Sequence, residues 1–255
     1  MFPKQTKEYN MLLLGETGVG KSTFINAFVN YMTFKTLDDA INSEDILCLI
    51  PSRFTISDKK LNEKLVVLGS DDNEDQMKVG ASSTQYTRSY RFPAGNAVIR
   101  LIDTPGIGDT RGTGVDETNF DHLLSVIGEL KDIHAICILL KPNHARLTVL
   151  FEYCIKQLLT RLQRSAADNI VFIFTNARGT FYKPGDTVIP LREALRTIEE
   201  QPPYVKIPFG QENTFSLDNE AFKFLVASRQ GVDFDDTSKR NFDSSWNTSA
   251  QICQK

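Results

Sequence analysis

Short, continuous apolar runs alternate along this chain with longer segments in which apolar residues recur every three or four positions. The runs AICILL at 135–140 and IVFIF at 170–174 have no polar face, which is typical of strands buried on both sides of a parallel sheet. Together with the turn signals between runs, the pattern predicts strands near Asn10–Leu14, Tyr86–Phe92, Ala97–Asp103, Ala135–Leu140, Ile170–Thr175 and Asn213–Leu217.

The segments with helical spacing lie between these runs. They predict helices near Ser22–Thr33, Glu117–Leu130, Leu147–Gln163, Leu191–Glu199 and Asn219–Ala227. The turn sequence PAGN at 93–96 indicates an antiparallel hairpin between two of the strands. We therefore expect an α/β fold with a mostly parallel central sheet, one antiparallel hairpin and helices on both faces.

Two segments do not follow this alternation. Residues 35–80 contain a possible helix in TLDDAINSED, a strand-like SRFTI and an acidic SDDNED, and we interpret them as an insertion within a domain spanning residues 1–232. Residues 233–255 are mostly polar, with a lone Trp246. We interpret this segment as a C-terminal tail or linker, with a docking segment or the edge of a fragment as alternatives.

Composition narrows the class of protein. Hydrophobic residues make up 41% of the 255 residues and charged residues 24%, the balance of a soluble globular chain. A net charge of −3 implies no global attraction to nucleic acid or anionic lipid. Four scattered cysteines and the lack of an apolar leader lead us to expect a cytoplasmic protein, without excluding membrane association through a longer parent protein.

One motif carries the strongest chemical signal. The sequence GETGVGKS satisfies GxxxxGK[ST] in full, directly after the apolar MLLL and before a helix-forming run. Its glycines let backbone N–H groups wrap phosphates, Lys21 adds a positive charge, and the Ser22 hydroxyl is placed to ligate Mg²⁺. The candidate phosphate-binding residues are Gly15, Glu16, Thr17, Gly18, Val19, Gly20, Lys21, Ser22 and Thr23.

A second motif, Asp103-Thr104-Pro105-Gly106, follows the apolar run AVIRLI. Its aspartate is expected at the carboxyl end of a buried strand, beside Ser22, where it can hold Mg²⁺ through water. The Gly106 N–H can sense the γ-phosphate and couple hydrolysis to loop order. A plain Asx turn is the alternative interpretation of this aspartate.

The extended sequence DTPGIGDT at 103–110 resembles septins, AIG1-type GTPases and the chloroplast outer-envelope import receptors, and the resemblance covers roughly the first 230 residues. The resemblance implies a P-loop GTPase domain that binds GTP or GDP with Mg²⁺ and acts as a switch. It also implies self-association into a dimer or oligomer through the nucleotide face, and work at membranes or in cytoskeletal filaments.

The catalytic machinery departs from the common pattern. A switch threonine that closes the Mg²⁺ shell is expected at Thr84 in GASSTQYT, with Ser83 and Thr87 as competitors. Where Ras-like enzymes carry a water-orienting Gln, this chain has Ile107, so unaided hydrolysis should be slow. The missing function can come from a backbone-positioned water, from another residue in the insertion or from a partner subunit. Arg111 and Arg146 are candidates for the last role, with a solvated surface position as the alternative.

The base-recognition motif also departs from its usual [NT]KxD form. After IVFIF the chain has TNAR, in which Thr175 is kept but the Lys and Asp are replaced by Asn176 and Arg178. Asn176 can hydrogen-bond the base and Arg178 can stack on it. Asp218 or Asn219, after the last strand, can supply the lost edge contact, although Asn219 also suits a helix N-cap.

These motifs lead us to expect a slowly hydrolysing switch or assembly GTPase in which Lys21, Thr84 and Gly106 serve hydrolysis and Ser22, Thr84 and Asp103 serve the metal. Two alternatives stay open. One is a scaffold that holds a nucleotide without turnover, and the other is an ATP-using P-loop enzyme such as a kinase.

Overall fold

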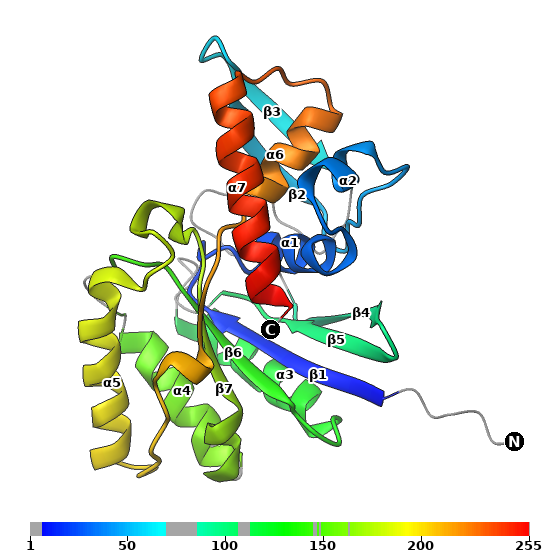
Figure 1. Cartoon of the computed structure of the whole chain (residues 1–255). Helices are drawn as coiled ribbons and strands as arrows, with labels where there is room; N and C mark the ends of the chain where they lie inside the picture. The colour runs from blue at the N-terminus through cyan, green and yellow to red at the C-terminus, as the bar shows by residue number, and fades with distance from the viewer. Residues whose placement is uncertain are drawn as a thin grey trace, which may run out of the picture.

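The computed structural model describes residues 7–69, 86–106, 113–144, 147, 149–162 and 164–254, with the backbone alone described at 113–119, 149–151 and 153. Its central element is a six-stranded sheet in the order β4-β5-β1-β6-β7-β8 (Figure 1). The strands are β1 (Lys7–Gly15), β4 (Arg88–Ala94), β5 (Ala97–Asp103), β6 (Ala135–Leu140), β7 (Ile170–Phe174) and β8 (Thr214–Ser216). Among the described strands of this sheet, only β4 pairs antiparallel, with β5. The predicted α/β fold with one hairpin is confirmed.

Helices cover both faces of this sheet. The helices of the described residues are α1 (Lys21–Thr33), α2 (Leu37–Asn42), α3 (Thr113–Gly128), α4 (Val149–Arg161), α5 (Val188–Glu200), α6 (Glu220–Arg229) and α7 (Asp236–Cys253), with short 3₁₀ turns η1 (Arg164–Asn169), η2 (Ala177–Thr180), η3 (Gly185–Thr187) and η4 (Gln211–Asn213). Leu12 and Leu14 of β1 face the core shared with α3, α4 and α5, whereas Leu13 faces the core shared with α1. This alternation is the pleat of a strand buried on both sides.

Some boundaries differ from those expected. The helix α5 starts at Val188, three residues before the predicted start, because Pro190 falls in the first turn, where a missing N–H breaks no helical hydrogen bond. Within residues 35–80, α2 and β2 (Ser52–Ser57) match the expected helix and strand, and β2 pairs with β3 (Glu63–Leu68), which the sequence analysis did not predict.

Residues 236–253 form α7, a packed helix and not the expected tail or linker, and this matches the docking segment that the sequence left as an alternative. Phe242, Trp246, Ala250 and Cys253 recur at helical spacing and belong to one core with α1, α2, α6 and β3. Trp246 is fully buried, with its ring edge-on to Tyr31 at 4.8 Å between centroids. The apolar residues of this helix stand singly between polar ones, so no apolar run marks it in the sequence. In Figure 1, α7 runs from the layer formed by α2, α6, β2 and β3 down to the sheet.

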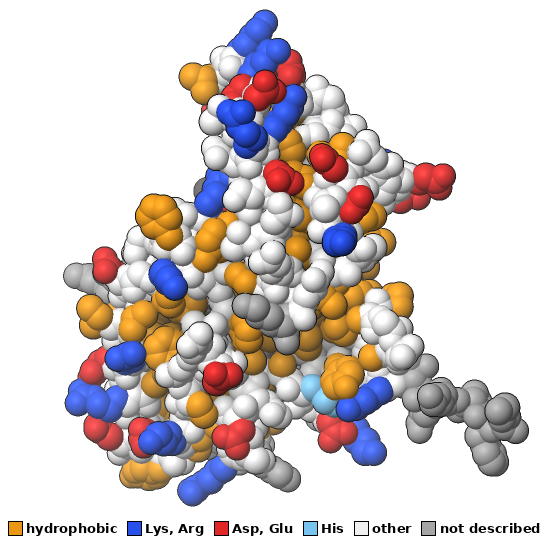
Figure 2. All heavy atoms as spheres, viewed as in Figure 1, with side chains coloured by type: hydrophobic (Ala, Val, Ile, Leu, Met, Phe, Trp, Pro, Cys, Tyr) orange, Lys and Arg blue, Asp and Glu red, His pale blue; other side chains and the backbone are white. Residues whose placement is uncertain are grey.

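An apolar groove of about 290 Å³ lies where the last turn of α7 meets the sheet beside α1. Its walls include Met11, Phe28, Val171, Phe215 and Ile252. Figure 2 shows hydrophobic side chains gathered on this face, below α7. Helices therefore cover this face of the sheet only in part. Over the described part of the chain, no helix has the length and apolar character needed to span a membrane.

Candidate functional site

The loop between β1 and α1 forms a cradle at the carboxyl end of the sheet. Gly18 and Gly20 have φ of 75° and 97°, values that residues with a Cβ rarely adopt. A Cβ on Gly15 would lie 2.8 Å from the Leu139 carbonyl oxygen, so this turn also requires glycine for space. Gly20 caps α1 without a side-chain bond, which leaves the first N–H groups of the helix directed at the loop.

Lys21 lies inside this cradle. Its Nζ donates to the Gly15 carbonyl oxygen at 2.9 Å, and the side chain is only 6% exposed. Burial lowers the pKa of Lys21 to about 8, although the nearby carboxylates of Asp103 and Glu16 act in the opposite direction. The ammonium group is therefore mostly charged at neutral pH and buried, and a bound anion would offset the burial cost of this charge.

We expect triphosphate binding at pH 8 to be accompanied by proton uptake, because Lys21 is about half neutral there in the free protein and must be charged against phosphate. Below pH 8 the affinity should be flat, and above it the affinity should fall by up to about tenfold per pH unit. Isothermal titration calorimetry at pH 8 in two buffers of different ionisation enthalpy measures the uptake. A binding enthalpy that is the same in both buffers would contradict this expectation.

The second motif meets the cradle at Ser22. Because β5 pairs with β1, Asp103 lies beside Leu13, and the Ser22 hydroxyl donates to the Asp103 carboxylate at 3.5 Å. Asp103 is fully buried, and the Thr104 hydroxyl fixes the turn by donating to the Leu13 carbonyl oxygen at 2.8 Å. A hydroxyl and a carboxylate side by side are the oxygen donors that Mg²⁺ prefers.

Gly106 passes directly against the cradle. A Cβ at this position would lie 2.6 Å from the Thr17 Cα and 2.8 Å from the Thr17 backbone nitrogen. Two backbone segments far apart in the sequence therefore approach closely enough that only glycine fits. The Gly106 N–H is thus held next to the loop that would carry a terminal phosphate.

On the side of the site where a base is expected, Thr175 supports the cradle. Its hydroxyl donates to the Val19 carbonyl oxygen at 2.7 Å and the residue is fully buried, so it holds the loop in place and does not face a ligand. Asn176, in the left-handed region with φ of 55°, is exposed and lines the cavity. Of the expected TNAR contacts, Asn176 has the placement that a ligand requires.

Asn219 is a further polar residue that lines the cavity. It precedes α6 as the N-cap residue, but its side chain makes no capping bond. It is 1% exposed, and among the described residues neither its Oδ1 nor its Nδ2 has a hydrogen-bond partner. Its Nδ2 lies 3.9 Å from where a Cβ on Gly20 would be. Such a buried, unpartnered amide at a cavity wall is costly unless a ligand completes it.

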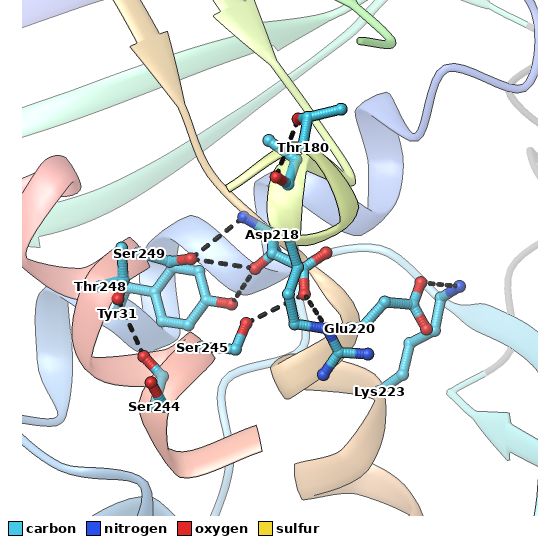
Figure 3. A network of polar contacts seen from close by, with 11 residues as sticks. Tyr31, Thr180, Asp218, Glu220, Lys223, Ser244, Ser245, Thr248 and Ser249 are labelled. Atoms are coloured by element: carbon cyan, nitrogen blue, oxygen red, sulfur yellow. Dashed lines mark hydrogen bonds and ion pairs between the residues drawn. The ribbon is translucent and has the colours of Figure 1, made fainter. Parts of the chain in front are cut away.

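Arg178 and Asp218 turn away from the cavity. The Arg178 Nε lies 3.7 Å from the Asp218 carboxylate, and its guanidinium lies 4.9 Å from the centroid of the Phe242 ring. Asp218 is 1% exposed and accepts a hydrogen bond from Ser245 at 2.9 Å (Figure 3). Burial raises the pKa of Asp218, and its contacts with Ser245 and Arg178 oppose that shift. The stacking surface for Arg178 in this structure is therefore Phe242.

A cavity of about 370 Å³ joins the two ends, within the size range of small-molecule sites. It is lined by Gly18, Gly20, Lys21, Ser22, Thr23, Lys141, Asn176, Asn219, Glu220 and Lys223. Sequence reasoning missed Lys141, Glu220 and Lys223, the last two forming an ion pair at 2.7 Å. The rule that ligands meet the carboxyl ends of parallel strands gave a usable signal, because all three follow β6 or β8.

The switch and catalytic positions fall largely outside the described residues. Thr84 and Ser83 lie there, as do Ile107, Arg111 and Arg146. Thr87 is described, and its buried hydroxyl has no hydrogen-bond partner within the described ranges.

Comparison with known proteins adds sequence relatives. Septin-8-A of Xenopus laevis is 35% identical over 96 residues, which cover 38% of this chain and 19% of that protein. Septin-8 of Rattus norvegicus is 35% identical over 69 residues, covering 27% of this chain and 15% of that protein. The matched stretches thus span less than a fifth of each relative.

Solved structures are similar at low identity. The crystal structure of Toc33 from Arabidopsis thaliana in complex with Mg²⁺ and GMPPNP aligns with a TM-score of 0.49 and 12% identity, over 98% of this chain and 85% of that one. The G domain of the T. maritima FeoB iron transporter aligns with a TM-score of 0.35 and 12% identity, over 88% of this chain and 99% of that one.

The family comparison covers more of the chain. A family model described as 50S ribosome-binding GTPase matches residues 10–177, which is more than half of the 255 residues and includes both the GETGVGKS and DTPG motifs. The chain therefore belongs to the GTPase family that this model describes, and its GTP-binding domain is of the P-loop type.

Proposed function

We propose that this chain binds guanine nucleotides with Mg²⁺, hydrolyses GTP slowly, and changes its self-association with nucleotide state. The observation that carries the proposal is a single cavity lined by Lys21, Ser22 and Asn219, whose buried amide has no hydrogen-bond partner among the described residues. Charge for phosphates and unsatisfied hydrogen-bonding groups for a base are thus present in one continuous space.

The phosphate end supports a triphosphate with a metal ion. The backbone N–H groups of the cradle and Lys21 would hold the phosphates, and Ser22 and Asp103 would hold Mg²⁺, which neutralises charge on the β- and γ-oxygens when bound. Thr84 belongs to this proposal as the group that closes the metal shell, and Gly106 as the residue that senses the terminal phosphate.

The base end supports guanine. Guanine presents N–H donors beside an oxygen acceptor, and the Asn219 amide offers the complementary acceptor and donor. Asn176 lines the same cavity and can add a second polar contact. Asp218 is not proposed as the base contact, because its carboxylate is bound to Ser245 and Arg178.

Slow hydrolysis and self-association complete the proposal. Ile107 stands where a water-orienting Gln would be, so a group from a second subunit is the proposed source of assistance. Self-association through the nucleotide face would bring such a group to the cavity. A scaffold that holds nucleotide without turnover is the second candidate, and the same Ile107 favours it.

A competition titration of ATP against GTP tests the proposal directly. We expect GTP to bind at least about tenfold more tightly than ATP, and Asn219→Ala to reduce this preference because a paired buried amide contributes about 1–3 kcal/mol. Asn42→Ala, at an exposed asparagine that ends α2, is the matched control. ATP competing as well as GTP would sink guanine specificity, and no phosphate release over hours would favour the scaffold.

A further inference from the structure

Asp218 joins the base end of the cavity to the C-terminal helix. Two serines one turn apart on α7 contact it: Ser245 donates to the carboxylate at 2.9 Å, and the Ser249 hydroxyl accepts from the Asp218 backbone N–H at 3.0 Å and lies 3.2 Å from its carbonyl oxygen. All three residues are at most 1% exposed. Figure 3 shows both serines directed at Asp218 from one face of α7.

The same residue also contacts the helix that begins in the phosphate cradle. The Tyr31 hydroxyl of α1 donates to the Asp218 carbonyl oxygen at 2.6 Å. The Tyr31 ring in turn packs edge-on against Trp246 of α7. Helices α1 and α7 therefore meet at Asp218, with no exposed member among Tyr31, Trp246 and Asp218.

These contacts fix the backbone that carries Asn219. The Asp218 carboxyl also accepts a backbone hydrogen bond from Glu220, so the residues on both sides of Asn219 are held. The Asn219 amide has no partner among the described residues, so no bond of its own directs it. Its direction toward the cavity is therefore set by the backbone, and that backbone is set by the contact of Asp218 with α7.

We propose that the docking of α7 affects nucleotide binding through Asp218. In this proposal Asp218 is a positioning residue that directs Asn219 toward the base, so that base binding and the docking of α7 are coupled. The proposal rests on the proposed function, since it assumes that a guanine base occupies this end of the cavity. Binding couplings are reciprocal, so a base that requires the aimed Asn219 strengthens the docking of α7 to the same degree.

Arg178 also connects Asp218 to α7. It pairs with the Asp218 carboxylate and covers the Phe242 ring of α7, and it lies two residues after Asn176, which lines the cavity. The loop after β7 contacts α7 through Arg178, and the loop after β8 contacts it through Asp218. A helix beyond the residues that the family model matches, 10–177, is in this way connected to both base-facing loops.

The double variant Ser245→Ala/Ser249→Ala tests the coupling, with Ser244→Ala as the control, because Ser244 is an exposed serine of the same helix. We expect the double variant to bind GDP with Mg²⁺ about five- to thirtyfold more weakly than wild type, and the control to bind as wild type does. Calorimetry measures the affinity. Equal GDP affinity in the double variant and the control would overturn the proposal.

Amide hydrogen exchange of the unaltered chain gives a second readout that needs no variant to fold. We expect GDP with Mg²⁺ to slow exchange in α7 by about the factor that the double variant loses in affinity, and this slowing to be absent from the double variant. Wild type that binds GDP without slower exchange in α7 would overturn the coupling alone. Wild type that binds no guanine nucleotide would instead overturn the proposed function.

Discussion

Lys21→Met is expected to weaken triphosphate binding by about a thousandfold, or roughly 4 kcal/mol. The phosphates would enter a buried cradle in which Lys21 supplies the ammonium charge at 6% exposure, and methionine is unbranched like lysine and only one atom shorter but carries no charge. Calorimetric titration with GTP and Mg²⁺ measures the loss. An unchanged affinity would remove the basis for placing phosphates in this cradle.

The same substitution should stabilise the nucleotide-free protein by about 1–3 kcal/mol at pH 7. Burial holds the pKa of Lys21 near 8, against 10.5 without burial, so the unfolded chain binds the proton more tightly than the folded one. The unfavourable free energy of burying this charge is fully present below pH 8 and decreases as pH rises from 8 toward 10.5. Methionine removes it at any pH, and urea denaturation without nucleotide measures the gain.

Lys141→Met is the matched control, because Lys141 lines the same cavity but is exposed. It should change stability by less than about 0.5 kcal/mol. If both methionine variants were equally stabilised, the cause would be a general effect of replacing lysine by methionine and not the removal of a buried charge. If Lys21→Met were destabilised, the buried hydrogen bond from Lys21 to Gly15 would outweigh the burial cost of the charge.

The phosphate end was predictable because its information is local. The cradle occupies consecutive residues, and Asp103 is brought to Ser22 by the pairing of two strands whose apolar runs mark their ends. The runs at 97–103 and 135–140 are bounded by polar or turn residues, and both became strands with the predicted limits. Strand β3 was missed because much of it is exposed, so it has no continuous buried run to detect.

The base end was not predictable in the same way. Asp218 and Asn219 are adjacent and both polar, and only the helix packed behind them decides which side chain turns inward. That helix was itself missed, because its polar sequence hides apolar residues such as Phe242 and Trp246 four positions apart. Arg178 was likewise expected to stack on a base, but its aromatic neighbour here comes from α7. Tertiary contacts, not local pattern, decide all three orientations.

Trp246→Ala is expected to destabilise the protein by about 3–5 kcal/mol, the cost of removing a large buried side chain that leaves a cavity. Trp246 of α7 is fully buried and packs edge-on against the ring of Tyr31. Its Nε1 has no hydrogen-bond partner among the described residues, so the loss is one of packing and not of a hydrogen bond. Urea denaturation followed by circular dichroism measures the change, since the variant lacks the chain's single tryptophan.

Gln251→Ala, an exposed position on the same helix, is the control and should change stability by less than about 0.5 kcal/mol. A free polar tail predicts that both substitutions are neutral, whereas a docked α7 predicts that only Trp246→Ala is costly. The contrast also bears on the nucleotide site, because Ser245 and Ser249 flank Trp246 and reach Asp218 only when α7 is docked. If the two denaturation curves coincided, α7 would not be docked in solution, and the support of Asn219 through Asp218 would fail with it.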